Sequence, residues 1–305
     1  MHIRHTRQDI AAWHREGLVV LPSFFHAQEV AAVAADFERI FPQVERHPTA
    51  LRQARDDGQA RFHARQFAHF ENIPFACSPA LNLAAVHPAL IAMARDALGT
   101  RDVRLYQAQA WAKFTGEADY DQPFHVDYNN HTLTVPAEDD VRNSITFFIY
   151  FSEVTDAHGP VHYVSRPDAA RVGCGPDAYM LSEADVQARL QTVGQACIAP
   201  AGSVFAYGID VWHRGSNLTA PYAHRYVMTA CFKRAGNDSI GYCAWPYHHL
   251  KPWDTIFDHA TPEQLACFGV PLPGDPFWTT LTLARAQHRR PGWDMTPWRE
   301  ALCKA

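Results

Sequence analysis

Residues 144–152 read SITFFIYFS, and this stretch carries the clearest signal for the fold. Isoleucine and phenylalanine at the odd positions from 145 to 151 alternate with threonine, phenylalanine and tyrosine at the even positions. In a strand, successive side chains point to opposite faces of the sheet. Because both faces of this segment are apolar, it is predicted to be a central strand that is covered on both sides.

Similar short segments surround this strand between residues 101 and 235. They are rich in Val, Phe, Tyr, Thr and Trp and are separated by Pro, Gly and Asp clusters, which is typical of strands in a sandwich or barrel. The other predicted strands are Val103–Phe114, Phe124–Tyr128, Gly159–Val164, Ser203–Tyr207, Val211–Ser216 and Arg225–Arg234.

Helices are predicted on both sides of the β region. Apolar residues recur at helical spacing over 27–41, which indicates an amphipathic helix. A second helix is expected from Pro88 to Leu98, since Pro suits the first helical position and Gly99 suits the C-terminal cap. A third is expected at 276–287, in a tail that we predict to cover an edge or the mouth of the β core.

The size and composition favour one globular domain that does not bind nucleic acid. The chain has 305 residues, 47% of them apolar, with 27 Lys and Arg against 32 Asp and Glu, and so lacks the basic excess of a nucleic-acid-binding domain. Neither repeats nor Gly/Ser linkers divide it. We expect a single domain over 1–305, with N-terminal support over 1–100, the β core over 101–235 and an extension over 236–305.

The same simple features bear on the cellular location. The opening MHIRHTRQDIAAWHREG lacks the apolar segment of a secretory signal, and no run of about 18 apolar residues occurs, so a cytoplasmic protein without a membrane segment is expected.

The seven cysteines are scattered without a C-x-x-C pair, which predicts buried thiols rather than disulfides or a zinc ribbon.

A candidate metal site begins with the triplet His125-Val126-Asp127. On a strand, His125 and Asp127 project from the same face and can bind one cation. The chain has 18 histidines, so the triplet alone carries little weight, and a third ligand is needed. His213 is the best candidate, because two His and one carboxylate on a β scaffold form the facial triad of non-haem Fe(II) oxygenases. The alternative is that both histidines are structural and Asp127 caps a turn.

Arg225 adds a second element to this pattern. It shares a strand face with Val227 and Thr229, opposite to Tyr226 and Met228. A buried guanidinium needs an anion, and a dicarboxylate cosubstrate on the iron would supply one through two parallel hydrogen bonds. The alternative partner is a surface Asp at the strand end.

Together these residues resemble the phytanoyl-CoA dioxygenase family of Fe(II)- and 2-oxoglutarate-dependent oxygenases. Similar segments are EGLVVLPSFFHAQEV (16–30), TDAHGPVHYV (155–164) and WHRGSNLTAPYAHR (212–225), and Lys113 precedes His125 at a spacing found in the family. The resemblance spans Trp13 to Lys233. It implies a mainly β protein with flanking helices, a double-stranded β-helix or cupin-like jelly roll with iron at its open mouth.

The resemblance also implies the roles of single residues. His125, Asp127 and His213 would bind Fe(II), Arg225 would bind the distal carboxylate of 2-oxoglutarate, and dioxygen would be the second cosubstrate. The implied reaction is hydroxylation of a small molecule with release of succinate and CO2. The residues implied as further contacts of 2-oxoglutarate are Lys113, Ser216 and Thr229.

The sequence departs from the family pattern at two places. Ser165–Asp168 replaces the usual Pro-Gly-Ser-His, so the wall beside the substrate is expected to differ, and the spacing from His213 to Ser216 and to Arg225 is one residue longer than the commonest form. Asp127 is retained, which argues against the halogenating relatives.

Two other classes of protein fit the same three ligands. One is a cupin-like binding protein without redox chemistry, and the other is a zinc hydrolase. Lys113 and Arg225 favour the oxygenase, because neither alternative needs a clamp for a dicarboxylate. Lesser candidates are Arg166, His131 and His162 as pocket residues for an acidic substrate, and His248–His249 as a metal pair, although neighbours on a strand face opposite ways.

Overall fold

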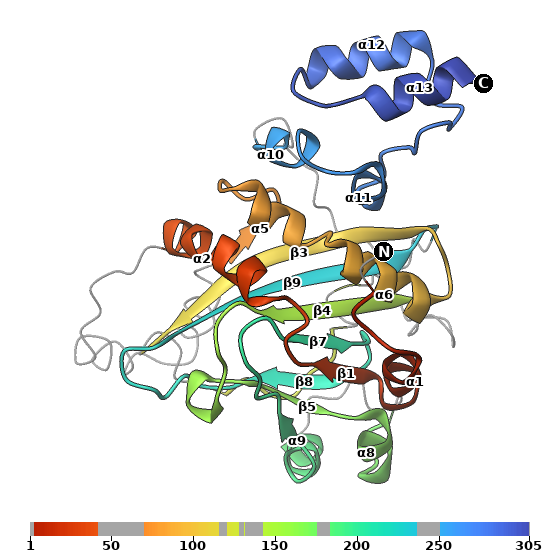
Figure 1. Ribbon diagram of the computed structural model, residues 1–305. Helices are drawn as coiled ribbons and strands as arrows, with labels where there is room; N and C mark the ends of the chain where they lie inside the picture. Colours follow the sequence, from red (N-terminus) through yellow and green to blue (C-terminus); the bar gives the residue numbers. More distant parts are fainter. Residues whose placement is uncertain are drawn as a thin grey trace.

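Two antiparallel sheets form the core of the protein (Figure 1). The structure, a computed structural model, describes residues 3–41, 70–115, 121–127, 131, 143–175, 184–236 and 251–304. In these ranges the larger sheet has six strands in the order β1-β7-β4-β9-β3-β2, and the smaller has the order β6-β5-β8. The strands are β1 (Leu18–Leu21), β2 (Phe70–Asn72), β3 (Val103–Phe114), β4 (Ser144–Tyr150), β5 (Val161–Val164), β6 (Gln195–Ala196), β7 (Val204–Tyr207), β8 (Trp212–Gly215) and β9 (His224–Arg234).

The central position predicted for residues 144–152 is confirmed. β4 pairs with β7 on one side and with β9 on the other, and all seven of its residues are buried. β3 has the predicted bounds, with a bulge between Leu105 and Gln107. The predicted strand Phe124–Tyr128 is reduced, in its described part, to a single bridge at His125, and Tyr128 lies outside the described residues.

The two faces of the larger sheet have different surroundings. On β9, Tyr226, Met228, Ala230 and Phe232 belong to a core that also includes the helices, here called the helix-covered core. Val227, on the alternate face, packs with residues of the smaller sheet, in the space here called the sheet interior. This is the alternation predicted from the sequence, and it places functional side chains between the two sheets.

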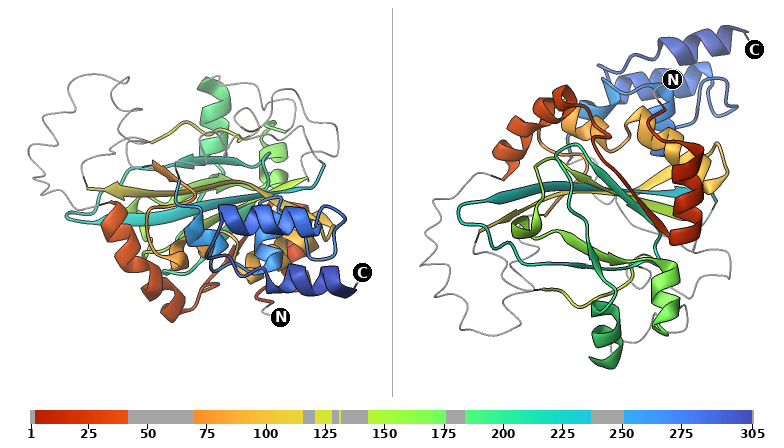
Figure 2. Two further views of the ribbon diagram at one scale, coloured as in Figure 1. Left: turned by 90° about the horizontal axis from the view of Figure 1, so that it is seen from above. Right: turned by 60° about the horizontal axis from the view of Figure 1, so that its bottom comes forward.

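Helices of the N-terminal third cover the outer face of the larger sheet (Figures 1 and 2). The helix predicted at 88–98 is confirmed with its Gly99 cap at φ 63°, and the one predicted at 27–41 is found one residue shorter. The first helix, which was not predicted, starts with a capping box between Thr6 and Asp9 and ends at Gly17. Up to residue 191 the described helices are α1 (Arg7–Glu16), α2 (Ala27–Ile40), α5 (Pro79–Ala84), α6 (Pro88–Leu98), α8 (Arg166–Arg171) and α9 (Ala184–Gln191), with a described 3-10 turn, η2, at Asp156–His158.

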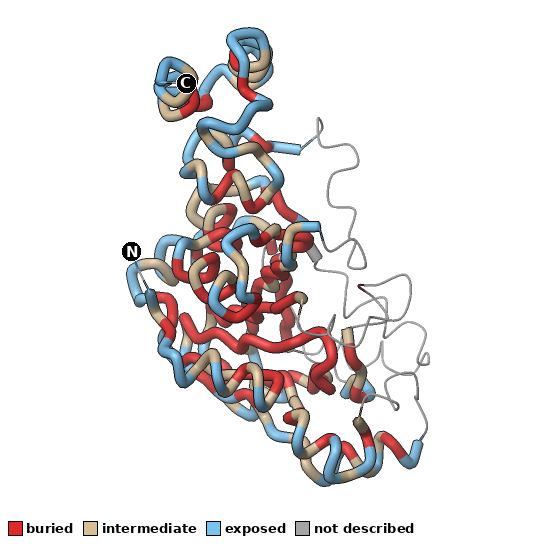
Figure 3. The backbone as a smooth tube through the Cα atoms, turned by 90° about the vertical axis from the view of Figure 1, so that its right-hand side faces the viewer, coloured by how far each residue is buried: buried red, intermediate tan, exposed pale blue. Residues whose placement is uncertain are grey.

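The described part of the C-terminal extension is helical and packs on the helical layer. Its helices are α10 (Asp254–Phe257), α11 (Pro262–Cys267), α12 (Thr280–Arg289) and α13 (Thr296–Lys304). Arg104 on β3 donates to Ala266 O at 2.7 Å, and Gln264 donates to Val86 O at 3.1 Å, which fixes α11 in place. Figure 3 shows α12 and α13 standing beyond the buried strands with exposed outer turns.

The bounds predicted for the helix at 276–287 were wrong. α12 starts at Thr280, because the Thr279 side chain accepts from the backbone N–H of Thr282 and caps the helix there. It then continues to Arg289. Pro276, which suggested the start, lies in the turn that precedes this cap.

The expectation of buried thiols holds for four of the described cysteines, whereas Cys77 is half-buried and Cys303 is exposed. The described cysteines are free, and Cys174, Cys197, Cys231 and Cys267 are buried. None of the described helices combines the length and the apolar character that crossing a membrane requires.

Candidate metal centre

Main-chain hydrogen bonds bring His125, Asp127 and His213 together. His125 and His213 form an isolated antiparallel bridge in which each backbone N–H donates to the other residue's carbonyl at 2.9 Å. This bridge places the His125 segment beside β8. One ligand atom from each of the three side chains lies within 4.8 Å of the others, close enough for all three to bind one ion.

Both imidazoles are oriented by backbone carbonyls. Nδ1 of His125 lies 3.0 Å from Pro123 O, and Nδ1 of His213 lies 2.9 Å from Val211 O. A carbonyl oxygen can only accept, so each Nδ1 carries the proton and each Nε2 keeps its lone pair for a metal. A hydrogen bond of this kind from the second ring nitrogen is usual for metal-binding histidines.

The carboxylate of Asp127 is held from the larger sheet. Tyr207 on β7 donates its hydroxyl to Asp127 Oδ2 at 3.0 Å, whereas Oδ1 lies 3.6 Å from His213 Nε2. Burial and the neighbouring carboxylate raise the pKa of Tyr207 well above its usual value, so the phenol keeps its proton and acts as the donor. Burial also raises the pKa of Asp127, but His213, His131, His125 and the Tyr207 hydrogen bond outweigh it and bring this pKa to about 2. Asp127 is therefore an anion at neutral pH, which suits a candidate metal ligand.

His131 and Tyr106 lie beside Asp127 and are joined by a hydrogen bond. His131 is buried, its backbone N–H donates to Asp127 O at 3.0 Å, and its Nδ1 forms a 2.9 Å hydrogen bond with the Tyr106 hydroxyl. The sequence suggested His131 as a pocket residue for an acidic substrate, but the structure shows it in contact with the backbone of Asp127 and with Tyr106. Tyr207 and Tyr106 were missed, since Tyr207 was interpreted as packing and Tyr106 was not considered.

Arg225 is fully buried in the sheet interior, as the strand alternation predicts. Its Nη1 donates to Gly159 O, and its guanidinium carbon lies 5.7 Å from the centre of the Trp111 ring and 5.9 Å from that of Phe148. Nε and Nη2 have no hydrogen-bond partner among the described residues. Burial lowers the pKa of Arg225 to about 10, which leaves the group charged at neutral pH. Two donors of this cation are thus available to an anion.

Lys113 lies next to Arg225 as its register partner on β3. It is buried, and its Nζ donates to Ser216 O at 3.0 Å. Burial and the Arg225 charge lower the pKa of Lys113 well below its usual value. Ser216 differs from what the resemblance implied, because its hydroxyl donates to Pro160 O at 2.7 Å, so its proton is committed to the backbone.

Polar side chains from β3 and β9 continue along the sheet interior. Thr229 pairs with Gln109 across the two strands, and its Oγ1 is buried with no partner among the described residues. Gln107 donates to Gln109 and leaves its own Oε1 buried without a partner there. Thr229 therefore has a free hydroxyl, and Gln107, which the sequence reasoning missed, adds a free acceptor.

Two of the remaining candidates, Arg166 and His162, lie in the described part of the chain. Arg166 forms an ion pair with Asp210, at 2.6 Å from Nε to Oδ2, and donates to the carbonyls of Trp13 and His14 at the end of α1, so it is structural rather than a pocket residue. His162 on β5 is half-buried and is the register partner of Arg214 on β8. His248 and His249 lie outside the described residues.

The family model for phytanoyl-CoA dioxygenase matches residues 13–222. The chain belongs to this family. As a phytanoyl-CoA dioxygenase family member it is an Fe(II)- and 2-oxoglutarate-dependent oxygenase-type enzyme, which confirms the resemblance and the cofactors expected from it. No curated protein sequence matches it.

Solved structures show the same fold. The non-haem α-ketoglutarate-dependent epimerase SnoN from nogalamycin biosynthesis is 17% identical, with a TM-score of 0.55 over 75% of this chain and 80% of that one. HygX from Streptomyces hygroscopicus with nickel and 2-oxoglutarate bound is 16% identical, with a TM-score of 0.50 over 77% and 89%. EctD from S. alaskensis is 17% identical, with a TM-score of 0.52 over 82% and 83%. The predicted cupin-like jelly roll with flanking helices is confirmed.

Proposed function

We propose that this family member hydroxylates a small organic molecule, with His125, Asp127 and His213 as the iron ligands and Arg225 as the anchor of 2-oxoglutarate. One observation supports this proposal above the others. A triad whose ligand atoms lie within 4.8 Å of one another shares the sheet interior with a buried guanidinium, two of whose nitrogens have no hydrogen-bond partner among the described residues. A metal site and an anion site built together suit a keto acid that binds a metal at one end and carries a carboxylate at the other.

The side chains present fit ferrous iron. Two imidazole nitrogens and one carboxylate oxygen are the donor set of the facial triad. When bound there, Fe(II) would supply open coordination positions for the keto acid and dioxygen. The surrounding protein orients the three ligands. The carbonyls of Pro123 and Val211 hold the imidazoles of His125 and His213, and the Tyr207 hydroxyl holds the carboxylate of Asp127.

Arg225 and Lys113 would bind the far carboxylate of 2-oxoglutarate. Arg225 offers Nε and Nη2, a pair of donors on one edge of the guanidinium that can hold both carboxylate oxygens. Lys113 adds a second cation beside it. The Thr229 hydroxyl is a further donor on the same strand, whereas Ser216 would contribute through its carbonyl, by positioning Lys113.

The proposed reaction consumes one 2-oxoglutarate, one dioxygen and one substrate C–H bond. One oxygen atom enters succinate as CO2 leaves, and the other becomes the hydroxyl of the product. SnoN is described as an epimerase and SnoK as a carbocyclase, so this fold serves more than one outcome. Hydroxylation is proposed because it requires no protein groups other than the iron ligands and the residues that bind 2-oxoglutarate.

The test is spectroscopic and then catalytic. Anaerobic protein with Fe(II) and 2-oxoglutarate should show a weak charge-transfer band in the visible, and admitting dioxygen should release succinate. Asp127→Ala should abolish both. Asp121→Ala is the matched control, because Asp121 lies on the same segment but is exposed and pairs with Arg214 at 2.9 Å.

Other results would point to the competing classes. Activity that persists without dioxygen and requires zinc would identify a hydrolase. Retention of iron and 2-oxoglutarate without any succinate would identify a binding protein. Either result would contradict the proposal.

A further inference from the structure

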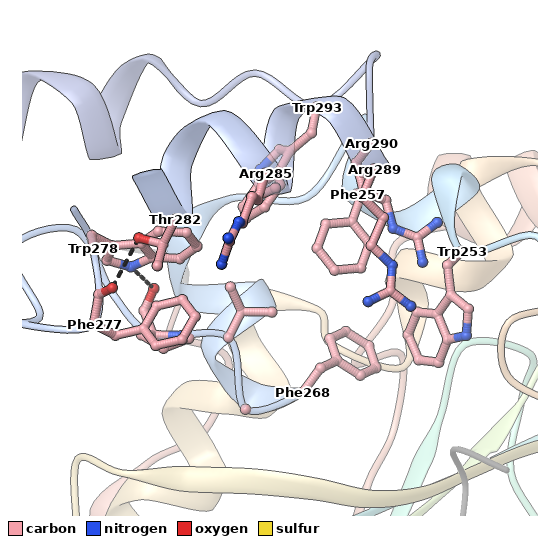
Figure 4. Close-up of a pocket in the computed structure, with 14 residues that line it drawn as sticks. Trp253, Phe257, Phe268, Phe277, Trp278, Thr282, Arg285, Arg289, Arg290 and Trp293 are labelled. Carbon is pink, nitrogen blue, oxygen red and sulfur yellow. Dashed lines mark hydrogen bonds between the residues drawn. The ribbon is translucent and has the colours of Figure 1, made fainter. Parts of the chain in front are cut away.

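A second cavity lies in the C-terminal extension, away from the metal centre. It has a volume of about 700 Å³, which is within the range of small-molecule sites. It is formed by α10, the segment after α11, and α12 (Figure 4). The tryptophans of this region belong to the helix-covered core, on the opposite face of the larger sheet from the sheet interior. The family match ends at residue 222, so this cavity lies in a part of the chain that the match does not cover.

Aromatic residues are the largest group in the cavity wall. Phe257 and Trp293 contact each other edge to face at 4.9 Å, and Trp253 and Phe268 do so at 5.7 Å. Phe277, which is 53% exposed, packs on Trp278 at the rim. Such a wall suits a flat apolar body, because ring faces and edges add to the free energy of burial.

Arginines supply the polar part of the wall. Arg285, Arg289 and Arg290 all lie on or directly after α12 and line the cavity, and no carboxylate lines it in the described chain. Arg290 is neutralised, since its Nη1 lies 2.7 Å from Asp254 Oδ1 and its guanidinium lies over the Phe257 ring at 4.7 Å. Arg285 forms no ion pair within the described part of the chain, so it contributes a positive charge to the cavity wall.

Arg285 is the cation best placed for a ligand. Figure 4 shows its guanidinium reaching into the space between Trp278 and Phe268. A buried donor adds to this: Trp293 Nε1 is buried and has no hydrogen-bond partner among the described residues.

We propose that this cavity binds a small organic anion with a ring-bearing apolar body, such as an aryl carboxylate. The rings would cover the apolar body, and Arg285 would bind the carboxylate. The site is separate from the metal centre, so its ligand is distinct from 2-oxoglutarate.

The experiment uses the full chain and two probes of the same shape. 2-Naphthoate carries the charge and naphthalene-2-carboxamide does not, and binding is measured by calorimetry and by quenching of tryptophan fluorescence. Naphthoate should bind saturably, at least about tenfold more tightly than the amide, and more weakly at high salt.

Three variants locate the site. Arg285→Gln should weaken naphthoate binding about tenfold. Phe277→Ala should weaken both probes, and its exposure makes it safe for folding. Arg7→Gln removes an exposed arginine from α1 and should change nothing. The charge-transfer band with Fe(II) and 2-oxoglutarate should be the same in all variants, which separates this test from that of the proposed function.

Several results would overturn the proposal. They are an absence of saturable naphthoate binding, equal affinity for the two probes, or an unchanged affinity in Arg285→Gln. A protein dimer that dissociates in Phe277→Ala and binds no naphthoate would show that a second copy of the chain occupies this surface instead.

Discussion

Lys113 and Arg225 are register partners on neighbouring strands, and both are buried. Each donates to one backbone carbonyl, and in the described part of the chain neither has a carboxylate within ion-pair distance. Without an anion, a protonated Lys113 beside the buried Arg225 guanidinium is unfavourable, because burial removes water and the two positive charges repel. The predictions on 2-oxoglutarate binding follow from this pair.

Replacing Arg225 should abolish 2-oxoglutarate binding without lowering the stability of the fold. Arg225→Met removes a buried charge whose Nε and Nη2 are unpartnered, so the free energy of unfolding without ligand should stay within about 1 kcal/mol of wild type or rise. The thermal stabilisation by 2-oxoglutarate should be lost. Arg166→Met is the matched control, since Arg166 is paired with Asp210 and its loss should cost about 3 kcal/mol. Equal destabilisation by both variants would show that Arg225 is already satisfied.

Lys113 should make 2-oxoglutarate binding depend on pH. Its pKa in the free protein is lowered by burial and by Arg225, and a bound dianion would raise it again. Below the lowered pKa Lys113 is already charged, so affinity is constant. Above it, binding must take up a proton, so affinity falls as pH rises.

Calorimetry tests this proton uptake. Heats of 2-oxoglutarate binding measured in two buffers of different ionisation enthalpy should differ on the alkaline side, and Lys113→Met should remove the difference. Identical heats for wild type across the alkaline range would mean that Lys113 does not titrate on binding.

Tyr207 should control metal affinity. Tyr207→Phe removes the donor to Asp127 Oδ2 and leaves the ring in place, and loss of such a support typically weakens metal binding about 10- to 100-fold. Tyr150→Phe is the control, because Tyr150 is equally buried but donates to Cys197 O. Titration with Mn(II), followed by calorimetry, measures both. Equal metal affinity in the two variants would remove Tyr207 from the site.

Much of the fold was predictable, because it depends on local patterns. The two-sided apolar alternation of 144–152 identified the central strand, and Pro88 with Gly99 gave the limits of α6. Strand alternation also placed Arg225 in the sheet interior. These features need only the order of neighbouring residues.

The contacts between distant segments were not predictable. Tyr207 and Asp127 meet because two sheets face each other, and no pattern within either segment encodes that distance. Arg166 looked like a pocket residue until its partner Asp210 was seen. The start of α12 was predicted four residues too early, because the capping hydrogen bond between Thr279 and Thr282 was not considered.

A substitution at Gly159 should disturb the anion site through the backbone. Gly159 has φ 65°, and a Cβ there would lie 2.6 Å from Ser216 O, which is too close for any side chain. Gly159→Ala should therefore cost about 2–4 kcal/mol of stability, from left-handed strain and displaced backbone. Because Gly159 O accepts from Arg225 and Ser216 O accepts from Lys113, the KM for 2-oxoglutarate should also rise.

Gly99→Ala is the control that distinguishes the backbone strain of a left-handed residue from the steric clash expected at Gly159. Gly99 has a similar φ of 63°, but nothing lies within 4 Å of its added Cβ, so this variant should cost about 1 kcal/mol and leave the KM unchanged. Chemical denaturation gives the stability of each variant, and succinate release gives the KM. A Gly159→Ala protein that loses stability but keeps its KM for 2-oxoglutarate would show that the two carbonyls do not position the cations, because the crowding would then be absorbed without moving Arg225 or Lys113.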